Sequence, residues 1–389
     1  MQLPYDANPL GVHPRVPRAV VLLIHTALVL GACEELGSER VGAQTGSEGR
    51  AAPTSREPSP GATTPAPAQA PVPPTSGVVV LTGPPPEVPS CFLPTPVHHP
   101  DWVRARNRVF ARADGQDLAL DVFRAPGEEP KPAIVLLHGG GWRAGERAHV
   151  NEPARAFARL GYAAVPVSYR LVDVETGTGR FPAPVNDVRC AVRYLRVHAD
   201  ELGIDPARIG VLGFSAGGHL AAMVATASDE GSLEPECPIT ESSPAVQVAV
   251  SFYGAHDLNA RFGSGARALI AAFLGPANSV ERRAAASPIT YVDPTDPPLL
   301  LVHGARDTVV PIDQSRRMYA RLLEEGVQAQ LVEVREGLHG FSIFREGRHP
   351  RASCTSLRFL AEHLRPVTPP PRNAPGRPRG ARVAPVDAP

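Results

Sequence analysis

The chain has 389 residues, enough for two average domains, and its 39 basic and 39 acidic side chains give a formal net charge of zero at pH 7. Balanced charge argues against a nucleic-acid partner held through phosphate contacts and against a polybasic membrane-binding surface. Fifteen of the 45 prolines lie in residues 53–100 and eight in residues 366–389, where folding cannot bury enough apolar area to offset chain entropy. We therefore predict a disordered linker over residues 33–100, one folded domain over residues 101–365 and a disordered tail over residues 366–389.

The N-terminus is typical of an exported protein. Two arginines precede an apolar run over residues 19–30, which is too short to span a bilayer but fits the apolar part of a secretory signal peptide. Directly after it, Leu30-Gly31-Ala32-Cys33 resembles the lipobox of bacterial lipoproteins, where a peptidase leaves the cysteine as a lipid-modified N-terminus. We predict a lipoprotein signal peptide over residues 1–32 and lipidation of Cys33, with a plain signal peptide cleaved after Ala32 as the alternative. The expected location is the periplasm or cell surface, or otherwise outside the cell, with membrane contact only through the lipid.

Four further cysteines follow, and the sequence leaves their pairing open: Cys91, Cys190, Cys237 and Cys354. Cys190 lies in a predicted helix beside Ala191, a context that favours a buried apolar residue over a disulfide partner. The sequence contains no C-x-x-C pair and no histidines at the spacing of metal ligands, so we predict no metal site.

From Asp101 onward, short runs rich in β-branched residues alternate with segments of helical period. Asp114-Gly115 joins the first two strands and is a turn typical of hairpins. The expected strands are Val103–Arg112, Leu118–Arg124, Ala133–Leu137, Ala163–Ser168, Ile209–Leu212, Val246–Phe252, Leu299–Val302 and Gln330–Val334. The expected helices are Glu152–Leu160, Val185–His198, Ala216–Ala227, Asp313–Glu325 and Ala352–Leu364.

This alternation predicts an α/β fold, a doubly wound, mostly parallel eight-stranded sheet with helices on both faces. The functional sites of such sheets lie at the carboxyl ends of the strands. A small cap insertion is expected within Gly254–Asp296, which contains an apolar helix near Ala266–Leu274. The proline-rich sequence ahead of the domain cannot form an additional helical cap, so we predict an open site.

A candidate nucleophile lies in Gly213-Phe214-Ser215-Ala216-Gly217, between an apolar strand and a predicted helix. A serine hydroxyl is a poor nucleophile unless it is held exposed beside a base. The small residues around Ser215 allow a turn from strand to helix that is sharp enough to expose it. We therefore interpret the motif as a nucleophile rather than an incidental turn.

A glycine-rich loop, His138-Gly139-Gly140-Gly141-Trp142, follows another predicted strand. Consecutive glycines allow the backbone to aim N–H groups at a negatively charged oxygen without interference from side chains. The alternative, a phosphate-binding loop, is disfavoured because Lys131 is the only lysine and the spacing of a dinucleotide fold is absent. We predict that Gly140, Gly141 and Ala216 supply the donors of an oxyanion hole, while His138 and Trp142 hold the shape of the loop.

A candidate acid and base follow the last two strands. Asp307 comes after an apolar strand in His303-Gly304-Ala305-Arg306-Asp307, and His339 comes after the final strand in Glu336-Gly337-Leu338-His339-Gly340-Phe341. The chain order serine, aspartate, histidine is the one that this type of sheet requires. His303 is the main rival base and is disfavoured because it lies at the end of its own strand. The competing aspartates are Asp257, Asp293, Asp296 and Asp313.

Together, HGGGW, GFSAGGH, HGARDTVVP and EGLHGF resemble the α/β-hydrolase superfamily, in particular the esterases related to hormone-sensitive lipase and the secreted acetyl or feruloyl carbohydrate esterases. The resemblance extends from about residue 101 to residue 365. It implies that Ser215 is the nucleophile, His339 the general base and Asp307 its orienting acid. His219, in the serine-glycine-histidine run, is expected to be a packing residue or a residue that supports the reacting side chains from behind.

These residues predict a serine carboxylic-ester hydrolase that forms an acyl-enzyme and needs no metal or organic cofactor. An open site favours short acyl or aryl esters, and acylated polysaccharide is the candidate natural substrate. Two alternatives remain at this point. One is an amide hydrolase, such as a formamidase or peptidase, with the same three residues. The other is a binding lipoprotein that has kept the fold and lost the chemistry.

Overall fold

The structure of the protein is a computed structural model that describes residues 77–81, 103–228, 230–233, 237–342 and 349–364. The predicted signal peptide, Cys33, Cys91 and the predicted C-terminal tail lie outside the described residues. Within the described part of the chain, no helix combines the length and the apolar composition needed to cross a membrane.

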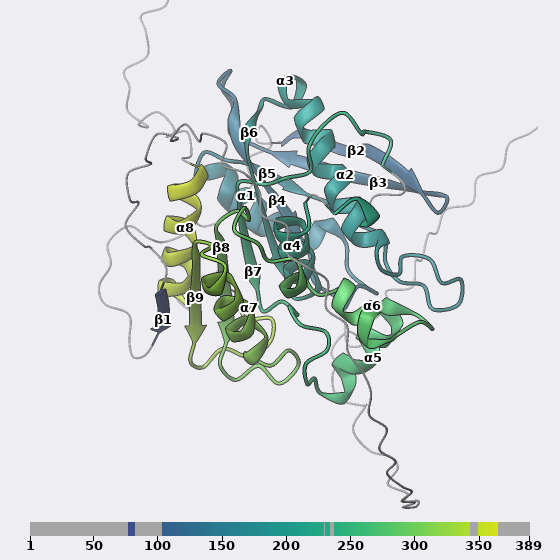
Figure 1. The fold of residues 1–389 in the computed structure, drawn as a ribbon. Helices are drawn as coiled ribbons and strands as arrows, with labels where there is room; N and C mark the ends of the chain where they lie inside the picture. The colour runs from purple at the N-terminus through teal and green to yellow at the C-terminus, as the bar shows by residue number, and fades with distance from the viewer. Residues whose placement is uncertain (1–76, 82–102, 229, 234–236, 343–348, 365–389) are drawn as a thin grey trace, which may run out of the picture. The chain divides into compact units, whose positions relative to one another are not determined.

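Nine strands of the described residues form one sheet, in the order β1-β9-β8-β7-β6-β4-β5-β3-β2 (Figure 1). They are β1 (Gly77–Leu81), β2 (Val103–Ala113), β3 (Gln116–Phe123), β4 (Lys131–Leu137), β5 (Ala163–Pro166), β6 (Ile204–Phe214), β7 (Val248–Phe252), β8 (Leu299–Gly304) and β9 (Ala329–Val334). All neighbours from β1 to β5 in this order are parallel, whereas β3 pairs antiparallel with both β5 and β2. The predicted doubly wound, mostly parallel sheet is therefore confirmed.

The central strands are buried on both faces, which explains their continuous apolar sequences. Every residue of β4, β7 and β8 is buried. A parallel sheet covered by helices on both faces leaves no strand position facing water, so alternation of apolar and polar residues is lost. At the other end of the sheet, the predicted hairpin turn is present, with Asp114 and Gly115 both at positive φ (49° and 73°).

Helices cover both faces of the sheet (Figure 1). They are α1 (Asn151–Arg159), α2 (Ala183–Val197), α3 (Ala199–Leu202), α4 (Ala216–Thr226), α5 (Ser264–Leu274), α6 (Val280–Ala285), α7 (Asp313–Glu324) and α8 (Pro350–Leu364), with short 3₁₀ turns η2 (Arg147–Val150), η3 (Gly231–Leu233) and η4 (Pro288–Thr290). Phe157 of α1 and Phe359 of α8 belong to one hydrophobic core. Val188 of α2, Leu220 of α4 and Met318 of α7 belong to the core of the opposite face.

The ninth strand corrects the predicted strand count and the predicted linker. Strand β1 lies within residues 33–100, for which composition predicts disorder, yet it pairs in parallel with β9 from Gly77↔Gln330 to Leu81↔Val334. Its sequence, GVVVL, is a β-branched run flanked by proline-rich segments, so average composition concealed it. Pairing with β1 also covers the backbone groups that β9 would otherwise leave open at the edge of the sheet.

The predicted cap insertion contains helices α5 and α6, between β7 and β8. Arg282 of α6 links the insertion to the rest of the domain, because its guanidinium donates to the carbonyl of Phe181 (2.7 Å). Within the insertion it also donates to the carbonyl of Leu274 on α5 (2.8 Å). The aromatic ring of Phe273 on α5 stacks on Trp142 of the glycine-rich loop at a centroid distance of 4.5 Å. The insertion is therefore in direct contact with the predicted oxyanion loop.

The prediction for Cys190 is wrong, because Cys190 forms a disulfide with Cys237. The helical pattern indicated correctly that this face of α2 is buried, but it could not show which distant segment covers it. That segment precedes β7, and Arg193 on the same helix also donates to its backbone, at Ile239 (3.2 Å). Cys354, in α8, is a buried cysteine.

Candidate active site

The backbone turns sharply at Ser215, between the end of β6 and the start of α4. Ser215 has φ 56° and ψ −117°, a conformation that L-residues rarely adopt, and its N–H donates to the carbonyl of Phe252 (2.9 Å). Glycine is required on both sides. A Cβ at Gly213 would lie 2.0 Å from the carbonyl oxygen of Gly217, and one at Gly217 would lie 2.5 Å from that of His138. Close packing of backbone against backbone thus permits the turn that exposes the hydroxyl.

The structure brings the three predicted residues into one hydrogen-bonded row. Ser215 Oγ lies 2.9 Å from His339 Nε2, and His339 Nδ1 lies 2.7 Å from Asp307 Oδ2. Asp307 follows β8 and His339 follows β9, so the parallel sheet places both loops at the same edge as Ser215. The side chain of Asp307 is fully buried, while that of His339 keeps 22% of its surface exposed. This arrangement allows His339 to accept a proton from Ser215 and to hold it against a carboxylate.

The Asp307 carboxylate is ionised because its surroundings donate to it. Burial by itself favours the neutral acid, but hydrogen bonds from His303 and His339 outweigh burial and hold the pKa of Asp307 well below its ordinary value. The backbone N–H groups of Val309 and Val310 also donate to Oδ1, both at 2.9 Å. The negative charge therefore persists beside His339 across the physiological pH range.

None of the rival residues occupies the position of the acid or the base. His303 is fully buried, and its nitrogens lie against Ser315 Oγ (2.7 Å) and the carbonyl of Val310 (2.9 Å) rather than against Ser215. The competing aspartates lie elsewhere: Asp313 and Asp257 pair with Arg317 on the surface, and Asp293 and Asp296 line a separate cavity.

The glycine-rich loop and the start of α4, which contain the predicted oxyanion donors, adjoin Ser215. A Cβ at Gly139 would lie 3.3 Å from Ser215 Cβ, which places the glycine-rich loop directly against the serine. Gly140 and Gly141 have φ 124° and 60°, backbone values that favour glycine. Ala216 is the first residue of α4, where N–H groups lack partners within the helix and the helix dipole favours negative charge.

Trp142 and His219 lock the glycine-rich loop to helix α4. Trp142 Nε1 donates to His219 Nδ1 (3.2 Å), and His219 Nε2 lies 2.8 Å from the carbonyl of Ala286. Because a carbonyl oxygen can only accept, Nε2 bears the proton and the ring is neutral. Complete burial, partly opposed by the hydrogen bond to Ala286, lowers the pKa of His219 to about 4. The expectation that His219 is a packing residue agrees with this position.

His138 holds the start of the same loop, as expected. Its ring stacks on Tyr169 at a centroid distance of 4.4 Å, and the Tyr169 hydroxyl donates to the His138 carbonyl (2.8 Å). Its Nδ1 lies 2.7 Å from the carbonyl oxygen of Gly139. His138 therefore holds the backbone at the start of the loop, and it also lines a cavity of about 400 Å³ beside the site.

Sequence reasoning missed Tyr253, which follows β7 and also has a positive φ, 41°. Its ring lies against His339 at a centroid distance of 5.0 Å, and its hydroxyl donates to the carbonyl of Phe341 (3.3 Å). A bulky residue in this backbone conformation is uncommon and marks a position that the surroundings hold firmly. No sequence motif identifies such strain in advance.

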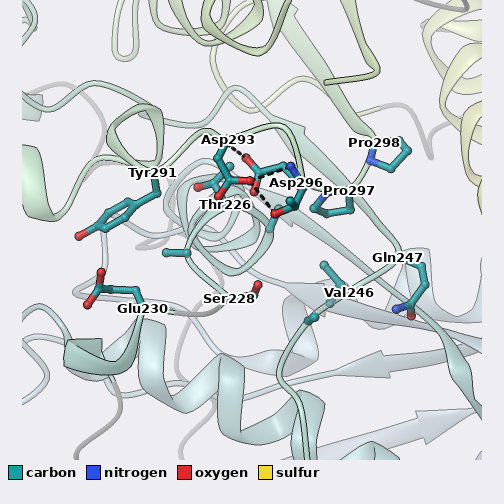
Figure 2. Close-up of a pocket in the computed structure, with 14 residues that line it drawn as sticks. Thr226, Ser228, Glu230, Val246, Gln247, Tyr291, Asp293, Asp296, Pro297 and Pro298 are labelled. Atoms are coloured by element: carbon teal, nitrogen blue, oxygen red, sulfur yellow. Dashed lines mark hydrogen bonds between the residues drawn. The ribbon is translucent and has the colours of Figure 1, made fainter. Parts of the chain in front are cut away.

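A cavity of about 400 Å³ adjoins the row. It is lined by residues next to the candidate site in sequence, among them Gly139, Phe214 and Gly340, and by the aromatic rings of Tyr253 and Phe341. Polar side chains of η2 and α1 form its rim, including His149 and Glu152. A second cavity, of about 690 Å³, lies at the opposite end of α4, beside the amino ends of β7 and β8 (Figure 2).

The second cavity contains polar groups that bond to one another. Asp293 accepts from the backbone N–H of Thr295 (2.7 Å), and Asp296 accepts from that of Asp293 (3.1 Å), as Figure 2 shows for the aspartates. Its lining includes no histidine or cysteine. Among the described residues, no group of three histidine, cysteine or acidic side chains is arranged to hold a metal ion.

Comparison with known proteins places this chain in a family. The family model described as BD-FAE matches residues 120–322, more than half of the sequence. The chain belongs to the BD-FAE family.

Among the curated relatives of this BD-FAE protein, the probable carboxylic ester hydrolase LipM of Mycobacterium tuberculosis is 28% identical over 255 residues, or 62% of this chain and 58% of LipM. Esterase LipC of the same organism is 32% identical over 270 residues, 66% of this chain and 65% of LipC. The chain thus spans less than two thirds of the length of these relatives.

Solved structures similar to the BD-FAE chain include proteins named as esterases. Thermogutta terrifontis esterase 2 phosphonylated by sarin matches with a TM-score of 0.57 and 28% identity, over 68% of this chain and 97% of that one. The acetyl ester-xyloside bifunctional hydrolase from Caldicellulosiruptor lactoaceticus matches with a TM-score of 0.57 and 27% identity, over 64% and 89%. A truncated carbohydrate esterase from gut microbiota has a TM-score of 0.56 and 25% identity, over 64% and 91%.

The lowered pKa of His219 predicts acid sensitivity of the fold. Between pH 6.5 and pH 4 the unfolded chain binds a proton at this histidine that the folded chain does not, so the free energy of unfolding falls as the pH drops through that range. In His219→Gln, the amide keeps a donor and an acceptor but does not titrate. We expect the stability advantage of the wild type over this variant to shrink by about 3 kcal/mol from pH 7 to pH 4, in urea unfolding. An advantage that stays constant across that range contradicts the assignment, and His149→Gln, at an exposed histidine, is the control.

Proposed function

We propose that the protein is a serine carboxylic-ester hydrolase with Ser215 as nucleophile, His339 as general base and Asp307 as orienting acid. The single observation that carries the proposal is the row from Ser215 Oγ through His339 to Asp307, with distances of 2.9 and 2.7 Å, above a strained turn from strand to helix. The relatives and similar structures, which are named as ester hydrolases and esterases, support the same conclusion.

The geometry suits acyl transfer in two halves. Ser215 Oγ attacks the ester carbonyl while His339 Nε2 takes its proton, and the carbonyl oxygen becomes an anion facing the N–H groups of Gly140, Gly141 and Ala216. His339 then gives the proton to the alcohol as it departs, and the acyl group remains bonded to Ser215 Oγ. Water repeats the sequence and releases the acid. Asp307 keeps the Nδ1 proton of His339 in place and stabilises its transient positive charge.

The acyl side of the site is narrow. Leu269 on α5 packs directly on Gly141, since a Cβ at Gly141 would lie 2.8 Å from Leu269 Cδ1. An acyl group whose carbonyl oxygen faces Gly141 therefore extends toward the Leu269 side chain. Because Trp142 and Phe273 stack and hold α5 on the loop, this wall has little freedom to retreat. The arrangement supports short acyl groups.

The alcohol side of the site is roomier and more polar. The cavity of about 400 Å³ next to His339 combines the aromatic surfaces of Tyr253 and Phe341 with a rim that includes His149 and Glu152. Aromatic faces and hydrogen-bonding rims suit hydroxyl-rich rings, which present both apolar and polar edges. We infer that acylated carbohydrate is the substrate class, and the similar structures named as a carbohydrate esterase and an acetyl ester-xyloside hydrolase support this.

Export is the second part of the proposal. The disulfide Cys190–Cys237 suits an oxidising compartment outside the cytoplasm. The predicted signal peptide, residues 1–32, and the lipobox-like Leu30-Gly31-Ala32-Cys33 support export with a lipid on Cys33. The lipid is the membrane contact that we propose for this chain.

Replacing Ser215 tests the proposed nucleophile. Ser215→Ala is expected to lose labelling by a fluorophosphonate probe and to lower turnover of p-nitrophenyl acetate by about 10⁴-fold or more, because the acyl-enzyme cannot form. Ser264→Ala, at an exposed serine of α5, should keep both properties. Retained labelling in Ser215→Ala, or turnover within tenfold of the wild type, contradicts the proposal.

Shortening Leu269 tests the proposed substrate class. Leu269→Ala should raise kcat/KM for p-nitrophenyl butyrate relative to acetate by about tenfold, since it opens room for the added methylenes. The control is Leu323→Ala, at an exposed leucine of α7.

Wild-type enzyme should prefer acetyl over decanoyl esters and should release acetate from acetylated xylan. Faster turnover of long-chain esters, or no release from xylan, argues against the assignment.

Labelling of Cys33 tests the anchor. Cells expressing the full chain and fed a radioactive fatty acid should incorporate it into the protein, and Cys33→Ser should abolish incorporation and move the protein from the membrane fraction to the soluble fraction. Cys354→Ser, which removes a buried cysteine, is the control. If the wild type remains unlabelled and soluble, Cys33 is not lipidated.

A further inference from the structure

A second histidine, His303, lies against Asp307 on the side away from His339. His303 lies in β8, four residues before Asp307, and none of its surface is exposed. Its Nε2 lies 3.4 Å from Asp307 Oδ2, the same carboxylate oxygen that accepts from His339. Two imidazoles therefore flank one carboxylate, one toward Ser215 and one toward the interior.

The hydrogen bonds of His303 show which nitrogen carries its proton toward Asp307. Nε2 lies 2.9 Å from the carbonyl oxygen of Val310, which can only accept, so Nε2 bears a hydrogen. The same nitrogen lies 3.4 Å from Asp307 Oδ2, so its N–H is the group that this carboxylate oxygen meets on the β8 side. On the far side of the ring, the hydroxyl of Ser315, at the start of α7, lies 2.7 Å from Nδ1 and fixes the orientation of the imidazole.

Val310 closes a small ring of contacts around the carboxylate. Its N–H donates to Asp307 Oδ1 (2.9 Å), while its carbonyl accepts from His303. Val310 thus ties the loop to Asp307 through its N–H and to His303 of β8 through its carbonyl. Loss of the His303 N–H would release that carbonyl and one neighbour of Oδ2 together.

Other titratable groups pack around His303, Asp307 and His339. Glu333, the register partner of His303 on β9, is held by the guanidinium of Arg316 at 2.7 and 2.8 Å. His256, which follows β7, interacts electrostatically with His303. Burial is the main cause that lowers the pKa of His256, to about 3. Tyr253 packs on His339, and burial, reinforced by the charge of Asp307, raises the pKa of Tyr253.

We propose that His303 is a positioning residue for the reaction, which rests on the proposed function of Ser215, His339 and Asp307. The N–H of His303 holds the loop of Asp307, so that the carboxylate faces His339 in one orientation. It also attracts part of the negative charge on Oδ2, which weakens the electrostatic attraction between Oδ2 and His339. Without this N–H, the negative charge concentrates on the bond to His339 and stabilises the protonated imidazole. His339 then needs a higher pH to act as a base.

The test compares two variants at this position. His303→Leu keeps a similar volume without a donor, and His303→Gln restores an N–H near the position of Nε2. For His303→Leu we expect a fall in kcat of about 10- to 100-fold and an upward shift of the acid limb of kcat/KM by about one pH unit. For His303→Gln we expect the acid limb of the pH profile of kcat/KM to lie within about 0.3 pH unit of that of the wild type. A second variant, Ser315→Ala, loosens the ring and should shift the limb in the same direction by less.

A shift of the acid limb separates positioning from mere stability. If His303→Leu lowers the rate and leaves the limb in place, or if His303→Gln behaves like His303→Leu, the proposal is overturned. If His303→Leu does not fold, the comparison of Ser315→Ala with wild type decides in the same way.

A proton NMR measurement distinguishes failure of this inference from failure of the proposed function. The downfield Nδ1–H resonance of His339, identified by its loss in His339→Gln, should titrate at higher pH in His303→Leu than in wild type. This readout needs no turnover. An inactive wild type whose resonance shifts as expected refutes the esterase proposal alone, whereas an active wild type whose resonance is unmoved in His303→Leu refutes the role of His303.

Discussion

The rest of the site depends on one backbone constraint, the left-handed turn at Ser215. A strand that enters a helix without a loop can expose a side chain at the top of a sheet only if neighbouring backbones approach within van der Waals contact. Gly213 and Gly217 permit that approach, and the N–H of Ser215 is fixed by the carbonyl of Phe252 on β7. The hydroxyl therefore stands at a defined point, and the loops after the neighbouring strands reach it from both sides.

The loops around Ser215 are rigid because their buried polar groups are paired. Trp142 connects the glycine-rich loop to His219 on α4, the helix that begins directly after Ser215. Asp307 is a buried anion, and it is stable there only because side-chain and backbone donors surround it. A fixed arrangement of dipoles is what stabilises charge as it develops in acyl transfer, since no solvent has to reorganise.

The fold and the three central residues could be predicted from sequence because each depends on local order along the chain. Continuous apolar runs identified the buried strands, and glycine-rich or histidine-bearing loops directly after them gave the candidate site whose three side chains lie in one row. The same local view failed at β1, where a five-residue strand lies within a proline-rich segment. It failed again at Cys190, because apolar spacing shows that a helix face is buried but not what buries it.

The sequence by itself determined which residues stand at the carboxyl ends of the strands, and hence that Ser215, Asp307 and His339 would share one edge of the sheet. Only the tertiary structure decided what surrounds them: Leu269 over the oxyanion loop and His303 behind the carboxylate. The physical reason is that strand order follows from hydrophobic pattern and short connections, which are local. Contacts between side chains distant in sequence depend on packing, which forms only when the whole domain has folded.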